Sequence, residues 1–299
     1  MKRVLAFVFL VGCASAPARP DTVVPPPAIE LMSAGKAPLV ALRYTPKLGR
    51  EETLLYTAQL GFGVAESPEA PWTADLLPPY TMTADLTTKS VDPSGTFETS
   101  YVIRAASVVA DPELPIESMV LLQDAIEPII SMKGWSKIDA RGVTLTFEAD
   151  APPGASSTTQ QLFDNMRPPL TSVCVPFPEE PVGVGGSWRV VSDIKGSLMA
   201  LKQSSLVQVV AIAGSEITLR ITIEQTAPPQ RMETQGLSQV DLLSLSSTGT
   251  GEVIVDLNRL VPTSATFEAR AVFVTKTTTE DGEAFITMHS STKVDYGPP

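Results

Sequence analysis

The chain has 299 residues, with 33 acidic and 22 basic side chains, a formal net charge of −11 at pH 7. Such an acidic surface repels nucleic acid and anionic lipid headgroups, which excludes both as electrostatic partners. With two cysteines, Cys13 and Cys174, and one histidine, His289, the chain can form neither a disulfide framework nor a histidine-rich metal site.

The amino terminus predicts an export signal over residues 1–12. Lys2 and Arg3 precede the apolar residues 4–11, a run far shorter than the roughly 20 residues that a helix needs to cross the hydrocarbon core. The sequence Leu10-Val11-Gly12-Cys13 that follows resembles the lipobox of bacterial lipoproteins. That resemblance implies cleavage before Cys13, diacylation of its thiol and a lipid anchor in a membrane of the cell envelope. The alternative is an ordinary secretory signal cut after Ala14 or Ala16.

The resemblance also implies a location. Ala14 and Ser15 follow the cysteine, with no aspartate, and the family's sorting rule then directs the protein to the outer membrane. Residues 13–37 are rich in proline and predict a semi-rigid tether of roughly 3 Å per residue. We expect residues 38–299 to form one β-rich extracytoplasmic domain, with possible lobes at 38–150 and 171–296.

From residue 39 onward, apolar and polar side chains mostly alternate, which indicates antiparallel strands with one buried face. Turn sequences separate the strands at residues 92–95, 213–215 and 280–283. The clearest alternating rows are Phe97, Tyr101 and Ile103; Val143, Leu145 and Phe147; Ile217, Leu219, Ile221 and Ile223; Phe267, Ala269, Ala271 and Phe273; and Ala284, Ile286 and Met288.

Two stretches change to a helical period. One has an apolar stripe with Pro128 inside it, which predicts a kink or an earlier end. The other combines a capping-box spacing with an apolar face and ends at Pro168-Pro169. The predicted fold is mainly β (α+β): one large curved antiparallel sheet or half-barrel, with two short helices packed on it. The helical residues are Leu122, Ala125, Ile126, Ile129 and Ile130 in the first, and Ser157, Gln160, Leu162, Phe163 and Met166 in the second.

Short motifs resemble an uncharacterised family of bacterial envelope lipoproteins with a β-rich domain. They are the lipobox, Lys47-Leu48-Gly49, the segment from Pro181 to Trp188 and Thr248-Gly249-Thr250-Gly251. The resemblance covers most of residues 39–296 and implies no activity. More remotely, the pattern is similar to the lipoprotein-carrier fold, a half-barrel that shelters acyl chains; this likeness is an analogy of fold alone.

The candidates for chemistry are few, and we expect no enzyme and no cofactor. Cys174 lies between valines and is predicted to be a small buried residue. His289 is predicted to be a solvated residue of a strand. The adjacent carboxylates Glu51 and Glu52 point to opposite faces of a strand, whereas Glu179 and Glu180 lie in a proline-rich loop. Residues 183–186 supply glycines for a bulge or tight turn, because no lysine and no helix follow them as in a phosphate loop.

Apolar side chains leave two functional hypotheses open. The first is a non-enzymatic lipoprotein that binds a lipid or another hydrophobic ligand between sheet and helices, with methionines at 119, 132, 166 and 199 as adaptable lining. The alternative is a structural or protein-interaction lipoprotein with a solid core. The aromatic residues expected in the core are Trp72, Trp135, Trp188, Phe62, Phe147, Phe163, Phe177, Phe267 and Phe273.

Overall fold

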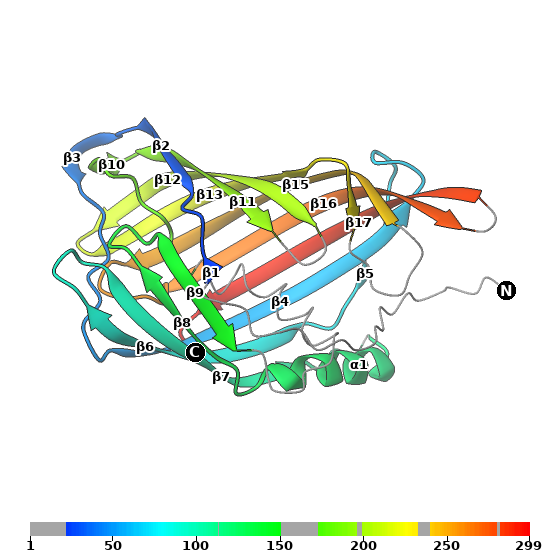
Figure 1. The fold of residues 1–299 in the computed structure, drawn as a ribbon, viewed down its shortest axis with the longest axis horizontal. Helices are drawn as coiled ribbons and strands as arrows, with labels where there is room; N and C mark the ends of the chain where they lie inside the picture. The colour runs from blue at the N-terminus through cyan, green and yellow to red at the C-terminus, as the bar shows by residue number, and fades with distance from the viewer. Residues whose placement is uncertain (1–21, 113, 151–172, 196–198, 233–239, 280–281) are drawn as a thin grey trace.

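The computed structural model describes residues 22–112, 114–150, 173–195, 199–232, 240–279 and 282–299. One 15-stranded sheet dominates this part of the chain, and a second sheet has two strands. Figure 1 shows long curved strands with a helix along one side. The expected fold class, a large curved antiparallel sheet, is therefore confirmed. The expected helix over residues 157–167 lies outside the described residues.

The strands are β1 (Thr22–Val23), β2 (Ala28–Ser33), β3 (Lys36–Val40), β4 (Glu51–Ala65), β5 (Asp75–Leu76), β6 (Tyr80–Val91), β7 (Phe97–Val108), β8 (Lys133–Ile138), β9 (Thr144–Asp150), β10 (Val182–Val184), β11 (Ser187–Lys195), β12 (Ala200–Ala213), β13 (Glu216–Ala227), β14 (Gln230–Met232), β15 (Val240–Asp256), β16 (Ser264–Thr279) and β17 (Gly282–Gly297). The helices are α1 (Ile116–Ile126) and the single 3-10 turn η1 (Glu127–Ile129).

Most neighbours in the sheet are also neighbours in sequence. The order runs from β9 through β8, β7 and β6 to β4, and from β17 through β16, β15, β13 and β12 to β11. β4 pairs with β17 in an uninterrupted antiparallel register, so the two expected lobes are halves of one continuous sheet. β9 and β11 stand toward the two ends of this order, where only β1 and β2 lie beyond them.

Local chemistry explains where the strands begin and end. β13 alternates Ile217, Leu219 and Ile221, all buried, with polar residues, as its period of two predicts. The turn before β7 is held by Asp92, whose Oδ1 accepts hydrogen bonds from the backbone N–H groups of Ser94 and Thr96 at 2.8 and 3.1 Å. α1 ends at Ile126, and η1 contains Pro128, which lacks the N–H that a continuing helix would use.

The predicted tether partly belongs to the sheet. β1 pairs with β9, and β2 pairs with β11, so residues from Thr22 onward pair with the body. Part of the segment expected as a tether therefore lies against the strands of the body. The physical reason is that edge strands present unpaired backbone N–H and C=O groups, and the amino-terminal segment supplies partners for both β9 and β11.

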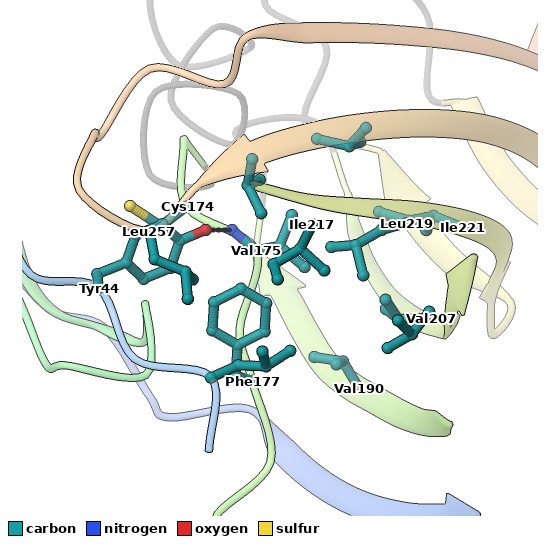
Figure 2. Close-up of a cluster of buried hydrophobic side chains, with 14 of the residues drawn as sticks. Tyr44, Cys174, Val175, Phe177, Val190, Val207, Ile217, Leu219, Ile221 and Leu257 are labelled. Carbon is teal, nitrogen blue, oxygen red and sulfur yellow. Dashed lines mark hydrogen bonds between the residues drawn. The ribbon is translucent and has the colours of Figure 1, made fainter. Parts of the chain in front are cut away.

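We call the face of the sheet that bears the main core its inner face. At the end shown in Figure 2, Tyr44 and Phe177 stack with ring centroids 5.1 Å apart and cover the inner residues of β11, β12 and β13. The Tyr44 hydroxyl accepts a hydrogen bond of 3.0 Å from the backbone N–H of Val175. Trp188 is fully buried, and its indole N–H donates to the Pro176 carbonyl at 2.8 Å. This end of the sheet is therefore filled by protein.

A second part of the core lies under α1. Ile126, Ile129 and Phe147 are buried there with inner residues of β4, β6 and β7. Gln123 of α1 replaces a strand beside β7, because its Oε1 accepts from the Val108 N–H at 2.9 Å and its Nε2 donates to the Ala106 carbonyl. The helix thus covers a stretch of strand edge that would otherwise need a partner.

Candidate ligand-binding face

The far half of the inner face exposes apolar side chains. Phe62 and Val64 of β4 are 47% and 72% exposed, and Met288 of β17 is 36% exposed. Phe273 of β16 lies beside them and is half-buried, because it also packs against a third buried cluster that includes Leu242 and Leu245 of β15. The register pairs Val64 with Met288 and Met288 with Phe273, so these side chains form one surface, which we call the open floor.

The open floor continues the face that forms the core, because none of these three strands has a register shift in this stretch. Leu54 on β4 and Tyr296 on β17 lie on the same face as Phe62 and Met288, and both pack in the core. An inner face normally buries its apolar side chains, so their exposure here marks a surface able to receive another apolar group.

The inner face of these three strands carries no charge in its described part, from Leu54 of β4 onward. A ligand that lies on it must present an uncharged surface, because nothing there would compensate a buried charge. The inner positions are Leu54, Tyr56, Ala58, Leu60, Phe62 and Val64 on β4; Ala265, Phe267, Ala269, Ala271, Phe273 and Thr275 on β16; and Ile286, Met288, Ser290, Thr292, Val294 and Tyr296 on β17.

Polar groups lie on the inner face of β12 and β13, which β15 separates from β16. Gln225 of β13 donates from its Nε2 to the Oε1 of Gln203 on β12 at 2.8 Å, and Gln203 donates in turn to the Ser205 hydroxyl at 3.3 Å. These amides satisfy one another in part while staying half-buried. They could orient the uncharged polar part of a ligand by hydrogen bonds.

Two tyrosines stand where the open floor meets the core. The rings of Tyr56 and Tyr80 lie with centroids 6.1 Å apart on β4 and β6. Burial, with the neighbouring Tyr80 as a lesser cause, raises the pKa of Tyr56 far above its ordinary value, and burial also raises the pKa of Tyr80. Both phenols therefore remain neutral hydrogen-bonding groups at any physiological pH.

One part of the packed interior leaves only a small free volume. A cavity of about 20 Å³ lies between β4, β6, β7 and β8. That is room for about one water molecule. Its lining residues include Leu54, Leu86, Tyr101, Ile138 and Cys174. A lipid could bind at this point of the sheet only if the surrounding core side chains moved apart.

The outer face carries the histidine. His289 is on the predicted face, but it is only 4% exposed, so the expectation of a solvated side chain is wrong. Trp72 stacks on it with ring centroids 5.1 Å apart, and the buried Nε2 has no hydrogen-bond partner in the described structure. Gly61 and Gly63 make this possible, because a Cβ at Gly63 would lie 2.7 Å from the Trp72 ring and 2.6 Å from the Thr73 carbonyl oxygen.

The aromatic core differs from the expectation at several positions. Trp188, Phe147 and Phe177 are buried as predicted. Trp72 and Trp135 are instead half-buried on the outer face, where the Trp135 indole N–H donates to Glu148. A period of two places a side chain on one face or the other, but it does not show that a loop such as residues 66–79 returns to cover the outer one. Phe163 and Met166 lie outside the described residues.

The carboxylate pairs do not form an acid–base site. Glu51 is exposed and Glu52 buried, on opposite faces as predicted. The Glu52 carboxylate lies 2.9 Å from the Nε of Arg50 and 3.1 Å from that of Arg259. It also accepts from the backbone N–H groups of Leu260 and Val261 at 2.7 and 3.3 Å. Such a fully satisfied carboxylate joins β4 to the loop between β15 and β16.

The remaining candidates have structural roles. Cys174 is buried, as predicted, and burial raises the pKa of its thiol far above the ordinary value. Gly185 has a φ of +80°, and the Gly186 N–H donates to the Gly183 carbonyl at 2.8 Å, which is the predicted tight turn before β11. Glu179 is an exposed loop residue that contacts Arg141 at 3.4 Å. Cys13 lies outside the described residues, and its acylation stays a prediction.

Membrane-spanning helices and metal sites are both absent from the residues that the structure describes. None of their helices combines the length and the apolar character needed to cross a membrane. They also contain no group of three or more His, Cys, Asp or Glu side chains placed to hold a metal ion.

Comparison with known proteins adds no family. The sequence matches no protein-family model, and a search of curated proteins finds no match. The resemblance to envelope lipoproteins therefore rests on the motifs alone, whereas the β-rich class with a large antiparallel sheet is shown by the fold.

The open floor was not predicted. Phe62 was expected in the core because of its residue type, and Val64 was not singled out. The sequence did contain one signal. Apolar and polar residues continue to alternate along β4 as far as Val64, near the end of a strand of 15 residues. What the sequence could not show is that the described segments which cover the inner face leave Phe62, Val64 and Met288 exposed.

Proposed function

We propose that this protein is a non-enzymatic lipoprotein of the bacterial outer membrane, anchored through an acylated Cys13, that holds a hydrophobic ligand on the open floor of its sheet. The observation that carries the proposal is the exposure of Phe62, Val64 and Met288 on the face that elsewhere forms the core. Apolar surface of this kind gains roughly 25 cal/mol for each Å² that a ligand covers.

The dimensions of the open floor suit an acyl chain. From Leu60 to Val64 the strand advances about 14 Å at roughly 3.4 Å per residue. This is about half of the roughly 30 Å hydrocarbon core of a bilayer, and thus the length of one acyl chain in its leaflet. A charged headgroup would remain in water, because the inner positions of β4, β16 and β17 offer it no partner.

A binding experiment tests the ligand site. Phe62→Asp and Val64→Asp place a charge on the open floor, and we expect each to weaken binding of a fluorescent fatty acid about 10-fold or more. Phe285→Asp is the matched control, because Phe285 is a 66% exposed phenylalanine on the outer face of β17. If circular dichroism shows that all three variants fold and all three bind the fatty acid with the same affinity, the proposal is contradicted.

The anchor has its own test. Cys13→Ser removes the thiol that the lipobox would acylate, and two or more acyl chains are what gives lasting membrane attachment. We expect the variant to leave the membrane fraction or to remain uncleaved. A variant of mature length that still fractionates with membranes as the parent does would refute the lipobox interpretation.

A second candidate function is supported by the small cavity. The interior between β4, β6, β7 and β8 has a free volume of only about 20 Å³. A protein-interaction lipoprotein with a solid core therefore also fits this part of the structure. In this case the open floor would contact a partner protein. Crosslinking with recovery of one partner through residues near Val64, and no bound lipid, would favour this alternative.

A further inference from the structure

The amino-terminal segment joins two strands that stand far apart in the order of the sheet. β1 pairs with β9, and β2 pairs with β11, within residues 22–33, which we call the strap. Figure 1 shows the strap in blue, running from β1 beside β9 to β2 beside β11. A single short segment thus holds β9 and β11, which mark opposite ends of the strand meander.

The strap limits how far β9 and β11 can lie apart. The Val24 N–H donates to the Leu145 carbonyl of β9 at 3.1 Å, and Ala28 pairs with Val191 of β11. The four residue steps from Val24 to Ala28 reach at most about 14 Å. Because β1 and β2 each lie about 4.8 Å from the strand they pair with, the sheet curls until β9 and β11 are within about 24 Å of each other at this point.

The two attachments of the strap differ in strength. β2 has five paired positions on β11, and its Ile29 and Leu31 pack against the buried core. β1 has two paired positions on β9, and the next residue, Val24, adds one backbone hydrogen bond and packs against the second part of the core. A backbone hydrogen bond shifts a folding equilibrium by only roughly fivefold, and such lightly attached elements open most often in native proteins.

We propose that β1 is a releasable clasp: it leaves β9 while β2 stays on β11, and the curled sheet then opens between β9 and β11. Residues 25–27 are three prolines, a stiff link that lets the released end swing as a unit about β2. Release of the clasp frees the edge of β9 and lets the curled sheet flatten along its inner face. Its part in ligand exchange rests on the function proposed above.

The position of the clasp couples it to the anchor. Thr22 follows Cys13 by nine residues, which extend at most about 32 Å. Any pull between the body and an anchored Cys13 reaches β1 before β2, because β1 is the first paired strand of the described residues. Tension on the anchor therefore opens β1 before it loads β2.

Disulfide staples test the clasp. Val23 faces Thr146 and Glu30 faces Arg189 in the register, and paired Cα atoms of antiparallel strands lie within the range that a disulfide spans. Val23→Cys with Thr146→Cys locks β1 to β9, and Glu30→Cys with Arg189→Cys is the matched lock of β2 to β11. Both are made in the full-length chain carrying Cys13→Ser and Cys174→Ala, so that no native thiol interferes.

Hydrogen exchange of the Leu145 and Phe147 amides of β9 is the first readout, because the Leu145 carbonyl accepts from β1's neighbour Val24 and alternate residues of a strand share one edge. We expect them to exchange faster than the paired amides of β11, and the β1–β9 staple to slow them about 10-fold or more on oxidation. The β2–β11 staple should leave them unchanged. Equal protection of β9 and β11 in the reduced protein, with no effect of the β1–β9 staple, would overturn the proposal.

The rate of fatty-acid uptake is the second readout. The β1–β9 staple should slow uptake and the β2–β11 staple should not; uptake unaffected by a staple that does slow β9 exchange would overturn the gating role. If no variant binds the fatty acid, the proposed function fails, and the exchange data alone decide on the clasp.

Discussion

Glu52 offers the sharpest test of how the two halves of the sheet are held together. Its carboxylate is 2% exposed and is bound by two arginine side chains and two backbone N–H groups. Removal of one partner from a buried ion pair costs about 3–5 kcal/mol, because the other charges are left without compensation. Arg50 and Arg259 are 33% and 25% exposed, so water relieves part of this cost.

We therefore expect Glu52→Ala to lower the free energy of unfolding by about 3 kcal/mol. Glu52→Gln keeps an acceptor for the backbone N–H groups and loses only the charge, so the expected loss is smaller, about 1–2 kcal/mol. Urea denaturation followed by circular dichroism measures both. The matched control is Glu51→Gln, an exposed neighbour on the opposite face, expected within about 0.5 kcal/mol of the parent.

The reasoning fails if Glu52→Ala costs less than about 1 kcal/mol, the range of an exposed pair. It also fails if Glu51→Gln is as destabilising as Glu52→Gln, because burial would then not be the cause. A change in the dependence of unfolding on urea, without a change in midpoint, would point to the denatured state instead.

Three further predictions follow from buried or paired groups. Burial raises the pKa of the Cys174 thiol, so a thiol reagent at pH 8 should label it only as fast as the protein unfolds; labelling at the rate of a free thiol would contradict this. Gly63→Ala should displace Trp72 and cost about 1–3 kcal/mol, as overpacking does; an unchanged near-ultraviolet circular dichroism spectrum and stability would exclude the contact. The hydrogen bond from Arg104 at 2.7 Å lowers the pKa of Asp85, so its small stabilisation is present above the unfolded pKa of about 3.9 and is lost as the pH falls through the lower folded value. Asp85→Asn should therefore lower stability at pH 7 by less than about 1 kcal/mol and have less effect at pH 2; a loss that grows in acid would reverse the sign.

Local patterns were sufficient for the strands. The alternation of Ile217, Leu219 and Ile221 predicted β13, and Pro128 predicted where α1 ends. These features depend on side-chain periodicity and on backbone chemistry within a few residues, which the sequence displays directly. The tight turn at Gly185 was predictable for the same reason.

Long-range coverage was not predictable. His289 is buried because residues some 220 positions earlier return across the outer face, and no local pattern contains that contact. The same is true of β1 and β2, which a proline-rich composition identifies as a tether although the sheet edges recruit them. The open floor was missed for the opposite reason: Phe62 has the residue type of a core position, and only the fold shows that no described segment buries it.

The most direct test of the central claim, that the inner face holds a hydrophobic ligand, is native mass spectrometry with lipid extraction. The chain carrying Cys13→Ser would be exported to a bacterial periplasm and purified without detergent. We predict a stoichiometric lipid mass that survives purification and is lost in the Val64→Asp variant. A bare protein mass in the parent chain would contradict the claim and leave the protein-interaction function as the account to pursue.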